Sequence, residues 1–267
     1  MDTERSIPTP STSTGPKIGQ IWNTEDYALN GRFVATLAAD VVTLLAPQPG
    51  EQILDLGCGD GVLTEQLAAS GAILTGIDAS PTMLAAARRR NLHVEQHDAT
   101  ALPYHDQFDA IFSNAVLHWI PGTSGHQALL AGVYRSLRPG GRFVAEMGGH
   151  GNIAAIRTAL QATLAPLQID AEATAASFFP SPEIYLRLLE AAGFTVRSIQ
   201  LIPRPTHLPN GMESWLNTFR NGVLDQLSPT DRATVLTNTI GLLEPILCDA
   251  NGNWTADYVR LRFHATK

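Results

Sequence analysis

Cysteine is scarce in this chain, with Cys58 and Cys248 the only two among 267 residues. Two cysteines cannot build the disulfide framework of a small secreted domain, and neither has histidines nearby at a zinc-site spacing. The sequence therefore predicts a fold held together by its apolar core, without a metal site and with its thiols in a reducing cytoplasm.

Positive charge is also in short supply. Eighteen Lys and Arg residues against 25 Asp and Glu residues give a net charge of −7. No basic run could neutralise successive phosphates, so we expect no nucleic-acid partner. The one basic cluster, residues 88–90, ends a helical pattern, where cations complement the helix dipole.

Long apolar runs are missing as well. None approaches the roughly 20 residues that cross a bilayer, so we expect no membrane partner. Residues 1–17 are rich in Ser, Thr and Pro and lack an apolar core, which is unlike a secretion signal and predicts a disordered tail. Residues 18–267 are long enough for one α/β domain. The sequence does not indicate an oligomeric state.

What the chain does have is a regular alternation of short apolar runs with helical patterns. A helix expected at 21–46 comes first. Strands are then expected at 52–56, 73–77, 93–96, 108–113 and 142–147, with helices at 63–69, 81–90 and 127–137 between them. Such alternation predicts a parallel sheet with crossover helices.

The regular alternation of strand and helix patterns ends after Gly151. Helices are expected at 153–164 and 182–192, a strand at 195–201, a wholly helical stretch at 211–247 and a last strand at 254–264. In that last run, apolar residues alternate with Tyr258, Arg260, Arg262 and His264. This pattern predicts an antiparallel strand at or near the sheet edge, with the two arginines on its solvated face. The domain core is then about 47–203 plus 254–265, and 204–250 is a helical lid.

A glycine-rich turn follows the first strand of the alternating region. It reads Asp-Leu-Gly-Cys-Gly-Asp-Gly over residues 55–61 and leads into a helical pattern. Glycines at such a turn let the backbone approach a nucleotide closely. A dinucleotide fingerprint would need its third glycine at Val62 instead of Gly61, and the Asp55 carboxylate would repel a pyrophosphate. The same carboxylate would attract the ammonium of a bound amino acid, so the pattern argues against NAD.

Two more carboxylates end the next two strands. Asp78 can accept hydrogen bonds from both hydroxyls of a ribose, a role that NAD enzymes share. Asp98, followed by Ala99, can accept a hydrogen bond from an adenine amino group, although an aspartate there also suits a turn or a helix cap. The strand ends together indicate a nucleoside site.

Residues 108–119 read Phe-Asp-Ala-Ile-Phe-Ser-Asn-Ala-Val-Leu-His-Trp. With the 55–61 turn, Asp78 and the Asp98-Ala99 step, this segment makes the chain resemble the class I S-adenosylmethionine-dependent methyltransferases. Within that class it is similar to the small-molecule enzymes of the trans-aconitate and juvenile-hormone-acid methyltransferase types. The resemblance covers residues 22–151 closely and the rest in outline.

The resemblance implies a Rossmann-like three-layer α/β sandwich with a mostly parallel seven-stranded sheet, an antiparallel last strand and a helical lid. It implies methyl transfer from S-adenosylmethionine to a small molecule, with S-adenosylhomocysteine as the product. It also implies the cofactor-binding residues, which are Asp55, Gly57, Gly59 and Gly61 along the methionine moiety, Asp78 at the ribose, Asp98 and Ala99 at the adenine, Asn114 and Ala115 under the cofactor, and Ala79 and Met83 beside them.

Methyl transfer mainly needs an acceptor held close and in line. His118 follows the fourth strand at the carboxyl edge of the sheet, which makes it the candidate catalytic residue, as a general base or as a donor to a substrate carboxylate. Trp119 beside it, Tyr27 in the first helix and His150 in a glycine-dense segment are candidate substrate residues. Packing or loop formation also suits each of them.

Further candidate active-site residues lie elsewhere in the chain. Glu146 precedes the glycine-dense segment, and Phe33 shares the first helix with Tyr27. For an acidic substrate, the cations available in the lid region are Arg204, His207 and Arg220, although a surface position is the expected place of each.

Several functions stay open on these grounds. A carboxylate acceptor would arrive ionised, whereas a hydroxyl acceptor would benefit from a base. Carbon methylation, cyclopropanation and methylation of a carrier-bound acyl group use the same cofactor. An NAD-linked oxidoreductase and a non-catalytic nucleoside-binding module are the alternatives outside this class.

Overall fold

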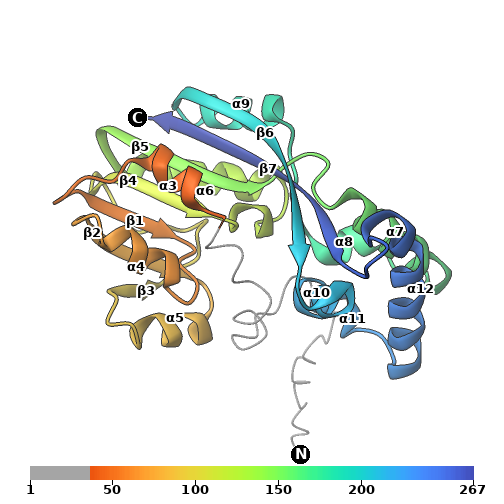
Figure 1. The fold of residues 1–267 in the computed structure, drawn as a ribbon. Coiled ribbons are helices and arrows are strands. Elements are labelled where there is room, and N and C mark those ends of the chain that lie inside the picture. The colour runs from red at the N-terminus through yellow and green to blue at the C-terminus, as the bar shows by residue number, and fades with distance from the viewer. Residues whose placement is uncertain (1–36) are drawn as a thin grey trace, which may run out of the picture.

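A mixed sheet organises the computed structural model, which describes residues 37–267 (Figure 1). In this part of the chain the sheet has seven strands in the order β3-β2-β1-β4-β5-β7-β6. Their bounds are β1 (Gln52–Leu56), β2 (Ile73–Asp78), β3 (Val94–Gln96), β4 (Phe108–Asn114), β5 (Leu137–Gly148), β6 (Thr195–Leu208) and β7 (Trp254–Thr266). The first five strands pair in parallel, and β7 is antiparallel to both β5 and β6.

Helices cover both faces of the sheet, which confirms the expected three layers. On one face α3 (Ala39–Leu45) and α4 (Val62–Ala68) pack on β1 and β4 through Val41, Leu45 and Leu67. On the other, α6 (Gly122–Ser136) and α9 (Pro182–Ala191) bury side chains such as Leu130 and Tyr185. Helix α5 (Pro81–Arg88) packs beside β3.

Three helices start with the same local signal. The side chains of Ser80, Ser181 and Ser228 accept hydrogen bonds from backbone N–H groups in the first turns of α5, α9 and α12 (Pro229–Leu247), and a proline follows each serine. A serine cap satisfies an otherwise unpaired N–H group, and proline suits the first helical position. The cap at Ser80 fixes the start of α5 directly after the carboxyl end of β2.

A second group of helices forms a separate cluster at one end of the sheet (Figure 1). We call this cluster the helical lid. It consists of α7 (Ala154–Leu164), η2 (Ala165–Leu167), α8 (Ala171–Ala175), α10 (Gly211–Phe219), α11 (Asn221–Leu224) and α12. The ends of β6 and β7 reach into it, since Leu208 and Tyr258 belong to its core.

The lid differs from the sequence-based expectation in two ways. It includes α7 and α8, which were expected in the sheet domain, and its helical stretch 211–247 is divided into three helices. Residues 204–208, expected in the lid, continue β6 because they pair with β7. Of the expected helix at 21–46, the described residues 37–46 contain α3, and residues 21–36, with the expected tail 1–17, lie outside the described residues.

Strand β7 is antiparallel, as predicted, and lies next to the edge strand β6. The predicted solvated face is wrong, because Arg260 and Arg262 are only 6% and 8% exposed. Alternation correctly separates these arginines from the apolar face of the strand. Helix α3 and the lid cover the polar face of β7. The alternation along the strand does not predict this cover.

A buried ion cluster fixes β7 and β6 to β5. Glu146, 2% exposed, accepts hydrogen bonds from Arg262 Nε at 2.7 Å and from Arg204 through both of its carboxylate oxygens. Arg262 also reaches Asp40 of α3 at 3.3 Å. Glu146 was a secondary candidate for the active site, but its carboxylate is taken up by these two structural partners.

We expect Glu146→Gln to lower the free energy of unfolding by about 3 kcal/mol, because two largely buried guanidinium groups would lose their counter-charge. Urea denaturation measures this change. The matched control is Glu65→Gln, since Glu65 pairs with Arg90 at 3.0 Å in a half-exposed position and should contribute less than about 0.5 kcal/mol. Equal losses in both variants would contradict a stabilising role for the buried cluster.

Candidate active site

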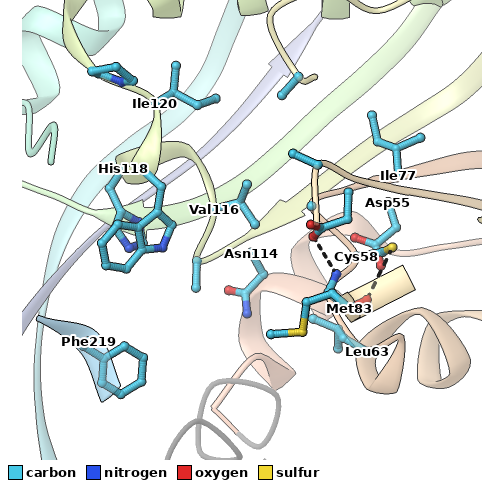
Figure 2. A pocket seen from close by; sticks show the side chains of 18 of the residues that line it. Asp55, Cys58, Leu63, Ile77, Met83, Asn114, Val116, His118, Ile120 and Phe219 are labelled. Carbon is cyan, nitrogen blue, oxygen red and sulfur yellow. Dashed lines mark hydrogen bonds between the residues drawn. The ribbon is translucent and has the colours of Figure 1, made fainter. Parts of the chain in front are cut away.

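A cavity of about 650 Å³ lies between the carboxyl ends of β1, β2 and β4 and the helical lid. This volume suits a cofactor together with a small substrate. Figure 2 shows Asp55 and Met83 at one end of the cavity, His118 and Phe219 at the other, and Asn114 between them. The two ends have different chemistry, and we call them the β1–β3 end and the lid end.

The glycine turn after β1 forms the floor of the β1–β3 end. Gly57 has φ +80°, and a Cβ there would lie 2.2 Å from a methyl group of Val116, so a side chain would not fit. Gly59 has φ +56°, and a Cβ there would meet no protein atom within 4 Å. The second glycine therefore leaves open space beside the backbone, as a closely bound ligand requires.

Asp78 joins this turn to the next strand. Its Oδ2 accepts a hydrogen bond from Gly59 N–H at 3.0 Å, and its Oδ1 accepts one from Ser80 N–H at 2.8 Å. Burial raises the pKa of Asp78, and these backbone hydrogen bonds oppose the shift. Each carboxylate oxygen keeps a lone pair for a further donor, so the pair can accept two adjacent ribose hydroxyls.

Asp55 lies at the bottom of the same end, 3% exposed. Thr64 Oγ1 donates a hydrogen bond to its Oδ2 at 2.6 Å. Burial raises the pKa of Asp55 to about 6, against the opposing effect of the Thr64 hydrogen bond. A buried carboxylate with one oxygen held in place is suited to pair with an ammonium group.

The other residues expected around the cofactor also line the cavity, and they are Gly57, Gly59, Ala79, Met83, Asp98, Ala99, Asn114 and Ala115. Gly61 does not line it, and a Cβ there would lie 2.4 Å from Leu92, so this glycine permits close packing. Asp98 forms a turn, since its Oδ1 accepts hydrogen bonds from Thr100 N–H at 2.8 Å and Oγ1 at 2.7 Å. Its other oxygen can still meet a ligand.

Four carboxylates line the β1–β3 end, and they belong to Asp55, Asp60, Asp78 and Asp98. They would repel the pyrophosphate of a dinucleotide but suit the ammonium and ribose groups of S-adenosylmethionine. The residues present therefore fit the cofactor that the sequence indicates.

The lid end carries the opposite charge. Arg220, at the junction of α10 and α11, and Arg260 of β7 both line it and are 4% and 6% exposed. Both were expected in solvated positions, and this expectation is wrong because the lid folds over them. Burial lowers the pKa of Arg220 to about 10, which still leaves it charged at neutral pH.

Two aromatic side chains lie between these arginines. The Arg220 guanidinium lies 5.9 Å from the Trp215 ring centre, and that of Arg260 lies 4.5 Å from the Tyr258 ring centre. Trp215 Nε1 donates a hydrogen bond to Tyr258 Oη at 2.7 Å. The ring faces offset part of the cost of burying two like charges.

His118 lies in η1 (Leu117–Trp119), directly after β4, and lines the lid end as predicted for its place in the chain. Its ring contacts Trp119 at 4.8 Å and stacks on Phe179 at 5.7 Å between ring centres. Burial, helped by Arg260 and Arg220, lowers the pKa of His118 well below its usual value. The imidazole is therefore neutral at pH 7.

Of the other residues that the sequence suggested for substrate binding, only some lie at the cavity. Trp119 lines the cavity, whereas His150 is exposed and is not among the residues that line it. Arg204 pairs with Glu146, and His207 is exposed. Tyr27 and Phe33 lie outside the described residues.

Sequence reasoning missed several lining residues of the lid end, which are Asn152, Phe179, Trp215, Phe219 and Tyr258. Only Tyr258 gave a usable signal, because it shares a strand face with Arg260. The others reach the cavity through the packing of the lid.

We expect the affinity for S-adenosylhomocysteine to fall as the pH drops below about 6. We expect the ligand ammonium to pair with ionised Asp55. The pKa of Asp55 is about 6, so protonation of Asp55 would remove the counter-charge in this range. The dissociation constant should be roughly tenfold larger at pH 5 than at pH 7. Calorimetry measures it, with Asp55→Asn as the control that binds weakly without this pH dependence. An unchanged dissociation constant in the wild-type protein would contradict the assignment.

Within residues 37–267, no helix is both long and apolar enough to cross a membrane. The same residues contain no cluster of three or more His, Cys, Asp or Glu side chains that could hold a metal ion.

Comparisons with known proteins agree with this site. A methyltransferase domain model matches residues 54–145. An uncharacterised methyltransferase of Schizosaccharomyces pombe is 37% identical over 256 residues, which cover 92% of this chain and 98% of the relative. The trans-aconitate 2-methyltransferase of Deinococcus radiodurans is 33% identical over 183 residues, covering 64% of this chain and 69% of that enzyme.

Solved structures show the same fold. A phosphoethanolamine N-methyltransferase of Haemonchus contortus in complex with S-adenosyl-L-methionine matches with a TM-score of 0.55 at 20% identity, over 87% of this chain and 52% of that one. An S-adenosylmethionine-dependent methyltransferase of Mesorhizobium loti matches with a TM-score of 0.52 at 19% identity, over 86% and 97%. Together with the glycine turn and the carboxylates of the β1–β3 end, the 37% identity to the Schizosaccharomyces pombe methyltransferase over 92% of this chain shows that the chain belongs to the class I S-adenosylmethionine-dependent methyltransferases.

Proposed function

We propose that this enzyme methylates a carboxylate oxygen of a small acidic molecule. The observation that carries the proposal is the charge of the lid end, where two buried arginines line the cavity and no lining residue described there is acidic. Buried guanidinium groups are well suited to bind carboxylates. The relatives named as trans-aconitate 2-methyltransferases support the same class of acceptor.

The bound cofactor supplies a methyl group on a positively charged sulfur. In the transfer, a carboxylate oxygen forms a bond to the methyl carbon while the carbon–sulfur bond breaks and its electron pair stays on sulfur. No proton leaves the acceptor in this reaction. The protein therefore has to attract, orient and shield the acceptor, and it needs no general base.

The tautomer of the neutral His118 ring favours a carboxylate acceptor over a hydroxyl acceptor. Gly148 N–H donates a hydrogen bond to His118 Nδ1 at 3.2 Å, so the proton of the neutral ring lies on Nε2. A ring with this tautomer can donate a hydrogen bond into the cavity but cannot accept a proton there. A hydroxyl acceptor would need a base that the described lid end does not offer.

The proposal predicts methyl-ester formation on carboxylic acids. Purified enzyme with S-adenosylmethionine is offered trans-aconitate and other di- and tricarboxylic acids, along with hydroxyl and amine acceptors of similar size. Product esters release methanol in alkali, whereas ethers and methylamines do not. Alkali-stable products alone would contradict the proposal.

We expect Arg220→Gln and Arg260→Gln each to raise the KM for a carboxylic acid at least tenfold, because each removes a buried charge that attracts it. The affinity for S-adenosylhomocysteine should stay within about threefold of wild type. Arg187→Gln, the same change at an exposed position of α9, is the matched control. Unchanged KM values in both cavity variants would show that the acceptor binds elsewhere.

A further inference from the structure

Gly148, the last residue of β5, brings two polar side chains of the lid end together. Its N–H donates to His118 Nδ1 at 3.2 Å. On its other side, a Cβ built on Gly148 would lie 2.7 Å from Asn152 Nδ2. His118 and Asn152, which come from different loops, therefore both contact this one residue, and both line the cavity.

The orientation of Asn152 is fixed by β7. The side chain is 2% exposed, and its Oδ1 accepts a hydrogen bond from Val259 N–H at 2.9 Å. Because the acceptor end of the amide is held there, the donor end, Nδ2, faces Gly148, and Asn152 is one of the residues that line the cavity. Within residues 37–267 Nδ2 makes no hydrogen bond, so this donor is left for a ligand in the cavity that Asn152 lines.

His118 presents a second donor of the same kind. With Nδ1 occupied by Gly148, Nε2 carries the ring proton, and within residues 37–267 it too makes no hydrogen bond. The packing of the ring against Trp119 and Phe179 restricts its rotation. Two side-chain donors without a protein partner, held in place beside one cavity, suit a ligand that accepts a hydrogen bond from each.

We propose that Asn152 Nδ2 and His118 Nε2 form a neutral donor pair that orients the reacting carboxylate of the acceptor. This inference rests on the proposed function. The pair binds the carboxylate oxygen that does not attack and so directs the other oxygen toward the methyl group. Neutral donors suit this task because they fix direction without the strong charge stabilisation that would make the attacking oxygen less nucleophilic.

Loss of the arginines and loss of the donor pair should change different kinetic constants. Arg220 and Arg260 attract the acceptor, and their loss acts on KM. The donor pair sets the geometry of the bound acceptor, and its loss acts mainly on kcat. We therefore expect Asn152→Ala to lower kcat about tenfold while KM for a carboxylic acid stays within about threefold.

Asn152→Asp separates a role in orienting the acceptor from a merely structural one. Aspartate keeps the acceptor for Val259 N–H but turns the cavity-facing donor into a carboxylate oxygen. The proposal predicts a kcat/KM about 100-fold below wild type and below that of Asn152→Ala. A structural role predicts the reverse order, with Asn152→Asp near wild type and Asn152→Ala impaired.

Controls keep these outcomes separate. Asn238→Asp, the same change at an exposed position of α12, should leave kcat/KM unchanged. Calorimetric affinity for S-adenosylhomocysteine and the thermal melting midpoint report whether each Asn152 variant is folded. If Asn152→Asp does not fold, the kcat of folded Asn152→Ala decides, and a wild-type kcat there overturns the proposal.

Variants of His118 provide a second, independent test of the donor pair. Glutamine can place an amide donor near the position of Nε2, whereas asparagine is too short to do so. The donor role predicts a higher kcat for His118→Gln than for His118→Asn, and equal losses would overturn it. If the wild-type enzyme methylates no carboxylic acid, the proposed function itself is wrong. Wild-type kinetics in Asn152→Asp on an acid that the enzyme does methylate would overturn the donor pair alone.

Discussion

Strand β7 enters the sheet antiparallel between β5 and β6, and much of the lid end of the cavity depends on this placement. Its register puts Arg262 opposite Glu146 and Arg260 opposite Gly148. Arg262 is thereby fixed in the buried ion cluster, while Arg260, two residues earlier on the same face, reaches the cavity. The same strand supplies the N–H group of Val259 that orients Asn152. A shift of β7 by one residue would turn both arginines toward the apolar core.

The cavity joins two ends of opposite charge. Carboxylates at the ends of β1 and β2 suit the ammonium and ribose of the cofactor, and the arginines at the lid end suit an anion. Because the two sets come from different parts of the chain, the β1–β3 end can stay constant while the lid changes. This separation explains how one fold accommodates one cofactor and many acceptors. It would also place the negatively charged acceptor that we propose next to a positively charged methyl donor, which is the pairing that such a reaction needs.

The sequence predicts the β1–β3 end well because that end consists of strand termini. Asp55 is the next-to-last residue of the first strand and Asp78 is the last residue of the second. Both can be placed from the short apolar runs that contain or precede them, because parallel strands bring such residues to one edge of the sheet. His118 could be placed by the same reasoning. The lid end could not, because alternation along β7 shows that Arg260 and Arg262 share a face but not what covers that face. The contact between His118 and Gly148 joins residues 30 apart in the chain and follows from no local pattern.

The most direct test of this account is a crystal structure of the enzyme with S-adenosylhomocysteine and a carboxylic acid that it methylates. The account predicts the amino-acid part of the cofactor at Asp55 and the carboxylates of the acid within hydrogen-bond distance of Arg220 or Arg260, with one carboxylate oxygen at His118 Nε2 and Asn152 Nδ2. An acid bound with its carboxylates away from the lid end, or arginines that hold the cofactor instead, would contradict it.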